Sequence, residues 1–101
     1  MDIPTADELP EDFSLYFEPS AGTVILPLTL LVASKPPETQ PGSVSKAAAL
    51  MRAAADGTVP RRRPITVRPL PGGKYLIVDG NATYGAALRA GWSSIPATVE
   101  T

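Results

Sequence analysis

The chain has 101 residues, of which 44% are hydrophobic and 19% charged, and this composition predicts one small globular domain rather than a disordered chain. It contains neither cysteine nor histidine, which excludes disulfides, thiolate chemistry and the commonest general base and metal ligand. Any catalysis must therefore use carboxylate, amine, guanidinium or hydroxyl side chains.

The charges are distributed unevenly along the chain. Six acidic residues and no basic residue precede Pro19, whereas nine basic and four acidic residues follow it. The second part therefore has a formal charge of +5, which favours phosphates or polyanions as ligands. The alternative is that surface charges simply fall this way in a small domain.

We interpret residues 1–20 as an acidic N-terminal arm and residues 21–101 as the domain. The apolar side chains of the arm either pack onto the domain, or form a docking segment for a protein partner or a pseudo-substrate strip over the basic face; we favour packing. These side chains are Phe13, Leu15, Tyr16 and Phe17. The chain shows no secretory signal and no membrane-spanning run of roughly 20 apolar residues, so we expect a cytoplasmic protein that does not interact with membranes.

The first element expected in the domain is a β-strand. Thr23–Leu26 is β-branched and apolar, and Pro27 then restricts this strand to a sheet edge or ends it. Residues 28–32 continue the apolar run as further strand or as one helical turn. The segment 34–42 contains three prolines and predicts a loop without regular structure.

A helix and a hairpin are expected next. Ser43 is the predicted N-cap of a helix over residues 44–56, which Gly57 ends. Its alanine-rich apolar face predicts close packing in the core. Two strands, 65–68 and 74–78, are joined by a Pro-Gly-Gly turn and predict an antiparallel pair.

The last part of the chain predicts a strand, a glycine turn, a second helix and a final strand over residues 95–99. Asn81 is the predicted N-cap of this helix, and Gly91 ends it. Its apolar face is predicted to contain Tyr84, Ala87 and Leu88. The complete order predicts an α+β (mixed α/β) domain with two main helices packed against a small sheet. A strand, a glycine turn and a helix also direct free backbone N–H groups at an anion.

Four pieces of the sequence, in this order, resemble the motifs of the ParB/sulfiredoxin superfamily, and in particular its N-terminal ParB domain, the ParB-like nuclease domain. They are ILPLTLLVAS, RRRPITVR, IVDGNATYGAALRAG and IPATV, and the resemblance covers residues 23–99. Members of this superfamily bind a nucleotide or its phosphates at the turn after the Asp-Gly strand. They include CTP-hydrolysing DNA-segregation clamps, ATP-using sulfiredoxins, free serine kinases and proteins described as nucleases.

By this resemblance, the phosphate-facing turn consists of Asp79, Gly80, Asn81, Ala82 and Thr83. Asp79 is the candidate catalytic residue, as a metal ligand or a base, and its alternative role is to tie the turn through backbone N–H groups. Active members of the superfamily place His, Arg or Cys directly after the glycine. This chain has Asn, Ala and Thr there, which excludes sulfiredoxin chemistry.

The guanidinium missing from this turn has three candidate replacements, Arg61, Arg62 and Arg63, at the start of the strand 65–68. In this fold class, that end of the strand can lie near the nucleotide turn. The alternative is that the three arginines are solvated and only prevent pairing at a sheet edge.

Three functions fit the sequence. The first is a stand-alone ParB-like domain that binds a nucleotide or phosphate, with ATP or CTP and Mg²⁺ as the implied ligands, in a regulatory or DNA-maintenance role of a bacterium, plasmid or phage. The second is a non-enzymatic protein-interaction adaptor that has lost the catalytic residues. The third is a weak nuclease or nucleic-acid binder that uses the basic face, although no aromatic residue lies within the arginine cluster to stack on bases. Enzymatic activity stays open; binding without fast turnover is favoured, because Glu38 is the only obvious second carboxylate.

Overall fold

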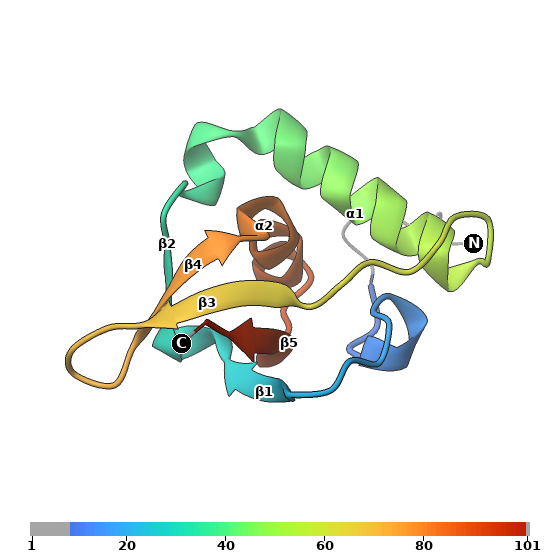
Figure 1. The fold of residues 1–101 in the computed structure, drawn as a ribbon. Coiled ribbons are helices and arrows are strands. Elements are labelled where there is room, and N and C mark those ends of the chain that lie inside the picture. The colour runs from blue at the N-terminus through green and yellow to red at the C-terminus, as the bar shows by residue number, and fades with distance from the viewer. Residues whose placement is uncertain (1–8, 101) are drawn as a thin grey trace.

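A five-stranded mixed sheet forms the centre of the computed structural model, which describes residues 9–100 (Figure 1). The strands are Thr23–Pro27 (β1), Leu31–Ala33 (β2), Ile65–Pro69 (β3), Tyr75–Asp79 (β4) and Ser94–Val99 (β5), and their order in the sheet is β1-β5-β3-β4-β2. The pairs β1–β5 and β3–β4 are antiparallel, whereas β2–β4 and β3–β5 are parallel. The predicted α+β class is confirmed.

Two α-helices, Pro41–Ala55 (α1) and Asn81–Arg89 (α2), pack against each other beside the sheet (Figure 1). Small residues allow their close approach: a Cβ atom added at Gly85 would lie 2.7 Å from Cγ2 of Val44 and 3.0 Å from Cβ of Pro37. The core beneath the helices contains Val44, Ala47, Ala48, Met51, Ile65, Val67, Ile77, Ala86, Ala87, Ile95 and Ala97. Within residues 9–100, no helix combines the length and the apolar character that crossing a membrane requires.

Three short 3₁₀ segments connect these elements: Phe13–Leu15 (η1), Leu28–Leu30 (η2) and Pro37–Thr39 (η3). Residues 28–32 thus adopt both of the alternatives expected, a helical turn followed by strand β2. Strand β1 lies at the edge of the sheet and ends at Pro27, as predicted.

The start of α1 differs from the prediction. The helix begins at Pro41, after Gln40 at the N-cap, and not at Val44 after Ser43. Proline is compatible with the first helical turn because its φ suits the helix and its missing N–H would have no partner there. The proline-rich segment is therefore partly regular, since it contains η3 and the first residues of α1.

One residue of the predicted apolar face of α2 is also placed differently. Ala87 is fully buried and Tyr84 is half-buried, but Leu88 is 45% exposed. Leu88 borders a groove of about 600 Å³ between α2, η3 and the start of α1, where the helices diverge. Burial, followed by the charge of Glu38, raises the pKa of the Tyr84 phenol in this groove.

Residues 9–20, called the N-terminal segment below, pack onto the domain through an aromatic cluster. The Trp92 ring, which is 5% exposed, lies 5.6 Å from the ring of Phe13, 5.3 Å from that of Tyr16 and 6.3 Å from that of Phe17. The indole N–H of Trp92 donates to the carbonyl of Leu9 at 2.8 Å. The predicted packing of the aromatic residues is confirmed, while residues 1–8 of the acidic arm lie outside the described residues.

Candidate functional site

The β4–α2 turn is built around Gly80. Its φ of +101° is unfavourable for residues with a side chain, and an added Cβ would lie 2.5 Å from Cγ2 of Ile65. Glycine is therefore required both by the turn and by the contact with β3. This contact places the start of α2 beside the start of β3.

The sequence predicted Asn81 as the N-cap of α2, but this prediction was wrong. The N-cap is Gly80, which offers no side-chain hydrogen bond. Asn81 is instead the first residue of the helix, and its side-chain oxygen accepts the backbone N–H groups of Ser34 at 3.0 Å and Lys35 at 3.1 Å. Its side-chain nitrogen donates to the hydroxyl of Ser34 at 3.0 Å. Asn81 thus holds the end of β2 against the start of α2, and the side chain of Lys35 begins beside this helix terminus.

The other turn residues differ in exposure. Asp79 is exposed, Gly80 and Ala82 are half-buried, and Thr83 is only 6% exposed. No acidic residue lies in the first turn of α2, and the helix has no side-chain cap. The first N–H groups of α2 therefore have no carboxylate of their own turn near them.

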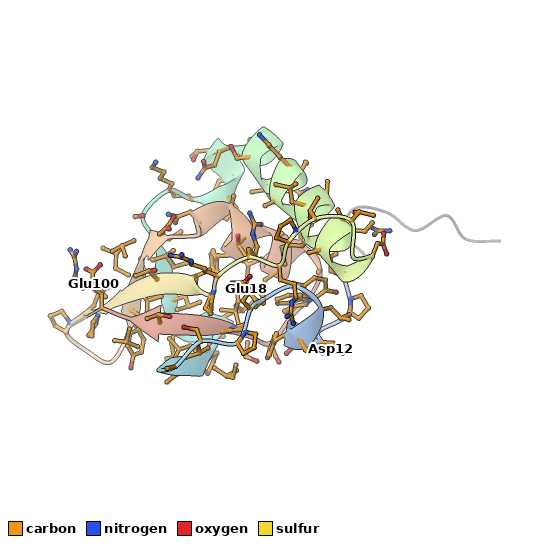
Figure 2. All side chains as sticks on the ribbon, turned by 45° about the vertical axis from the view of Figure 1, so that its right-hand side comes forward. Asp12, Glu18 and Glu100 are labelled. Carbon is orange, nitrogen blue, oxygen red and sulfur yellow. The ribbon has the colours of Figure 1, made fainter. Side chains whose placement is uncertain are left out.

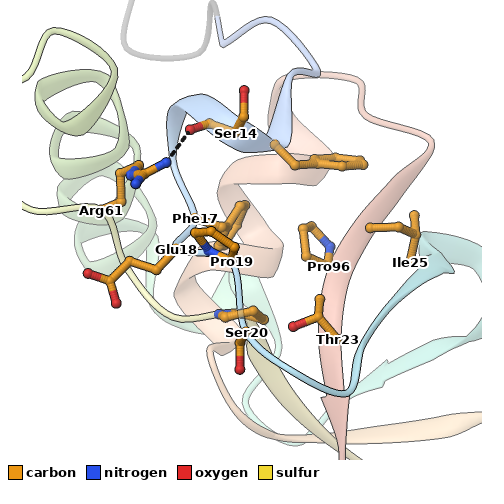
Figure 3. A pocket seen from close by; sticks show the side chains of 11 residues that line it. Ser14, Phe17, Glu18, Pro19, Ser20, Thr23, Ile25, Arg61 and Pro96 are labelled. Atoms are coloured by element: carbon orange, nitrogen blue, oxygen red, sulfur yellow. Dashed lines mark hydrogen bonds between the residues drawn. The ribbon is translucent and has the colours of Figure 1, made fainter.

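The three arginines before β3 do not act as one cluster. Arg61 lies against the N-terminal segment, where its Nη1 donates to the carbonyl of Ser14 at 3.1 Å (Figure 3). Arg62 lies near Leu50 and Ala54 of α1, on the helix-covered side. Arg63 lines a different cavity, together with Asp79. The alternation follows from the extended chain, in which successive side chains point to opposite sides.

Arg62 is the most constrained of the three. Burial lowers the pKa of its guanidinium, and the negative charge of Asp79 opposes that shift. Its Nη1 atom is buried and has no hydrogen-bond partner. The backbone of Arg62 is fixed by the N-terminal segment, because its N–H donates to the Tyr16 carbonyl at 2.8 Å and its carbonyl accepts the N–H of Glu18 at 2.9 Å.

A polar cavity of about 510 Å³ lies where β4 ends and β3 begins. It is lined by Glu18, Pro19, Ser20, Arg63, Pro64, Thr66, Asp79 and Thr98. In the sheet register, Thr66 of β3 pairs with both Asp79 of β4 and Thr98 of β5. Figure 2 shows Glu18 near the start of β3 and Glu100 near its far end. Sequence reasoning missed Thr66 and Thr98, because only the strand order brings them to Asp79. It missed Glu18 because only the contact of the N-terminal segment with Arg62 brings that residue to the cavity.

An apolar cavity of about 300 Å³ adjoins the polar one (Figure 3). The two cavities share Glu18, Pro19, Ser20 and Pro64, and the remaining lining of the apolar cavity is Phe13, Ser14, Phe17, Thr23, Ile25, Arg61 and Pro96. The turn residues 80–83 line neither cavity. Within the described part of the chain, no three Asp or Glu side chains gather as a metal site would require.

The sequence matches no family model and no curated protein. The structure is similar to the crystal structure of sulfiredoxin from Arabidopsis thaliana, with a TM-score of 0.57 and 21% sequence identity over 78% of this chain and 84% of that chain. The fold is sulfiredoxin-like. A second similar structure is the C-terminally truncated chromosome-partitioning protein ParB from Caulobacter crescentus complexed with CTP-gamma-S, with a TM-score of 0.49 and 28% identity over 79% of this chain and 44% of that chain.

The sulfiredoxin-like fold expected from the sequence motifs is confirmed. This chain spans less than half the length of the ParB chain that it matches. Within this sulfiredoxin-like fold, Arg63 lines a cavity together with Asp79, and Arg62 lies on the opposite, helix-covered side but still feels the charge of Asp79. Arg61 is directed to the N-terminal segment.

Proposed function

We propose that this protein binds the phosphates of a nucleotide at the β4–α2 turn, with Arg62 and Arg63 as the cationic residues. One observation carries the proposal: the guanidinium of Arg62 is half-buried, has an Nη1 without a partner and feels the charge of Asp79, two residues before α2. A buried donor without a partner destabilises a protein by about 1–3 kcal/mol. A phosphate oxygen at Nη1 would remove this cost and accept a charge-assisted hydrogen bond.

The N-terminus of α2 supplies the second attraction. Its first N–H groups lack a side-chain cap, and its first turn lacks an acidic residue. The positive end of a helix stabilises an anion by about 0.3–1 kcal/mol at the surface and about 2 kcal/mol when partly buried. Gly80 has no side chain and Ala82 has only a methyl group, so neither covers this end of the helix. The hydroxyl of Thr83 belongs to the same first turn.

The carboxylate of Asp79 makes nucleotide binding at the proposed site dependent on a divalent cation. This exposed carboxylate repels a phosphate unless a divalent cation lies between them, and oxygen ligands of this kind suit Mg²⁺. Mg²⁺ commonly binds proteins through one or two carboxylates and completes its coordination with phosphate oxygens and water. We therefore expect nucleotide binding to depend on Mg²⁺ in the wild type and less so after Asp79→Asn.

Binding with slow turnover is the activity that these residues support best. Phosphoryl transfer requires several cationic groups and an oriented nucleophile. Among the described residues near the turn, Asp79 is the one carboxylate placed to act as a base or metal ligand on the phosphates, since Glu18 stands on the opposite wall of the polar cavity. The proposed role is regulatory or in DNA maintenance, as the sequence resemblance implies, in the cytoplasm.

The test compares two arginines that belong to the same chain segment. Thermal shifts are measured with ATP, CTP, GTP, ADP and inorganic phosphate, with and without Mg²⁺, on the wild type, Arg62→Gln and Arg68→Gln. Arg68 is the matched control, because it is paired with Glu100 at 2.6 Å near the far end of β3. A ligand at 100 times its Kd stabilises the fold by about 2.7 kcal/mol. We expect this shift in the wild type and Arg68→Gln, and its loss in Arg62→Gln.

A second variant separates binding from stability. Ala82→Asp places a carboxylate in the first turn of α2, where it stabilises the helix by about 0.3–1 kcal/mol. The same carboxylate repels a phosphate, so the variant should melt no lower than the wild type and yet bind no nucleotide. An equal ligand shift in all variants contradicts the proposal. The absence of any shift in the wild type would favour the adaptor function.

A further inference from the structure

We propose that the polar cavity binds the sugar of the ligand, so that the site as a whole takes a phosphorylated sugar, either the ribose of a nucleotide or a free sugar phosphate. The inference rests on the proposed function, because the phosphates are assigned to α2 and the arginines. It assigns a separate task to residues that the phosphates do not need. These residues are Thr66 and Thr98, together with Glu18 and Ser20 on the opposite wall.

The floor of the polar cavity is a row of side chains in register across three strands. Asp79 of β4 pairs with Thr66 of β3, and Thr66 pairs with Thr98 of β5. Neighbouring strands lie about 4.8 Å apart, so the row extends over roughly 10 Å. This length suits a pentose ring with its hydroxyl groups and is too great for a single bound ion.

The row continues one strand further, to Thr23 of β1, which pairs with Thr98. The Oγ1 atom of Thr23 is buried and has no hydrogen-bond partner in the protein. Buried hydroxyls are normally hydrogen-bonded, so this end of the row has hydrogen-bonding capacity that the protein itself does not use. Thr23 lines the adjoining apolar cavity and not the polar one, so its hydroxyl lies beside the proposed sugar site and not within it.

The chemistry of the lining selects hydroxyl groups over other ligands. A carboxylate only accepts hydrogen bonds, and a threonine hydroxyl both donates and accepts them. The carboxylate of Glu18 repels a phosphate from the cavity, and the other carboxylate, that of Asp79, is assigned to the Mg²⁺ of the phosphates. A sugar is neutral and carries adjacent O–H donors that one carboxylate can accept together.

The two parts of the proposed site are close enough for one ligand. Asp79 lines the polar cavity, and the first residue of α2 follows two positions later. Two steps of the chain span at most roughly 7 Å. A phosphate group attached to a sugar covers a similar distance, so the phosphate can lie at α2 while the sugar occupies the cavity.

The experiment measures affinities by titration calorimetry in the presence of Mg²⁺. The ligands are ATP and CTP, their 2′-deoxy forms, ribose 5-phosphate and inorganic tripolyphosphate. The variants Thr66→Val and Thr98→Val remove a hydroxyl group at nearly constant volume, and Thr29→Val, at an exposed position of η2, is the control. The wild type and the control should prefer the ribose form about tenfold, the effect of one hydrogen bond.

In Thr66→Val and Thr98→Val, we expect this preference to fall below about threefold, with the affinity for tripolyphosphate unchanged. Equal binding of ribose and deoxyribose forms by the wild type would overturn the sugar assignment and leave the phosphate site intact. The sugar assignment would also be overturned if both cavity variants preferred the ribose form as strongly as the wild type does. If neither tripolyphosphate nor any nucleotide binds, the proposed function fails together with this inference. Ribose 5-phosphate binding as tightly as ATP or CTP identifies a sugar phosphate as the ligand, and tighter nucleotide binding identifies a nucleotide.

Discussion

The polar cavity and the apolar cavity share one wall, yet they offer different chemistry. Their common wall is the part of the N-terminal segment from Glu18 to Ser20, and their floors come from the same sheet. The polar floor contains the register pair Thr66 and Thr98, and the apolar floor contains the pair Ile25 and Pro96. On β5, these floors are only two residues apart. The comparison shows that a step of two residues along the sheet changes the chemistry of the floor beneath one covering segment.

The largest effect on stability should come from removing the ring of Trp92, on which the N-terminal segment packs. Trp92→Ala deletes the ring on which Phe13, Tyr16 and Phe17 pack, and it removes the hydrogen bond to Leu9. We expect the free energy of unfolding to fall by about 3–5 kcal/mol, as for other buried aromatic residues. Urea denaturation monitored by circular dichroism measures the loss.

The control for this variant is Leu88→Ala, because Leu88 is 45% exposed and distant from both cavities. It should cost less than about 1 kcal/mol. A loss below about 1 kcal/mol in Trp92→Ala would show that the N-terminal segment does not depend on this cluster.

The next variant changes the β4–α2 turn, which lines neither cavity but directly follows Asp79 of the polar cavity. Gly80→Ala introduces a Cβ at φ +101°, 2.5 Å from Cγ2 of Ile65, whereas Gly72→Ala introduces one at φ +92° with no atom within 4 Å. The positive φ costs both variants about 1–2 kcal/mol. Overpacking against Ile65 should cost Gly80→Ala about 1–3 kcal/mol more. Equal unfolding midpoints of the two variants in urea would refute the proposed contact.

A smaller effect should distinguish two neighbouring arginines. Arg62→Met removes a half-buried charge and an N–H without a partner, so we expect an unchanged or slightly higher stability. Arg61→Met removes a hydrogen bond to the Ser14 carbonyl at the apolar cavity, and we expect a loss of about 0.5 kcal/mol. Thermal melting at low ionic strength compares the two. A larger loss in Arg62→Met than in Arg61→Met would indicate that Arg62 stabilises the fold and is not reserved for a ligand.

The smallest effect concerns the pH dependence of the N-terminal segment. Hydrogen bonds from the backbone and the hydroxyl of Ser93, and then from Ser94, lower the pKa of the Glu11 carboxyl from its ordinary value of 4.5. A lowered pKa stabilises the fold above pH 4.5, and this contribution is lost as the pH falls below that value. Between pH 6 and 3, the melting temperature of the wild type should therefore fall more steeply than that of Glu11→Gln. Parallel curves would show that these bonds do not favour the ionised form.

Most of the fold could be predicted because its signals are local. Pro27 at the end of β1, the Pro-Gly-Gly hairpin and the glycines after both helices act through their own backbone conformations. Where two local signals compete, the prediction was wrong: Ser43 is a good N-cap, but α1 starts at Pro41, three residues before the predicted Val44. Side chains of an extended chain point alternately to opposite sides, and applying this rule to residues 61–63 would also have separated Arg62 from its two neighbours.

The candidate site could be predicted only in part, because it depends on distant pairs. The partners of the Asn81 side chain, Ser34 and Lys35, are 47 and 46 residues away in the sequence. No local pattern indicates that the side-chain amide of Asn81 binds these two residues instead of capping α2. Likewise, the row of Asp79, Thr66 and Thr98 exists only because β3 lies between β4 and β5. The resemblance to known motifs therefore named Asp79 as a candidate, whereas no signal in the sequence indicated the residues beside it.

The hydrogen bond between Trp92 and Leu9 joins residues 83 positions apart, almost the full described chain. A ribosome makes the N-terminal segment first, but the surface that receives it is complete only after Trp92 has been added. Phe13, Tyr16 and Phe17 must therefore remain exposed on the growing chain throughout most of its synthesis. During that interval, three aromatic side chains are available to chaperones and to aggregation. In this protein, a segment that is synthesised before the sheet and helices is among the last parts of the domain to reach its place.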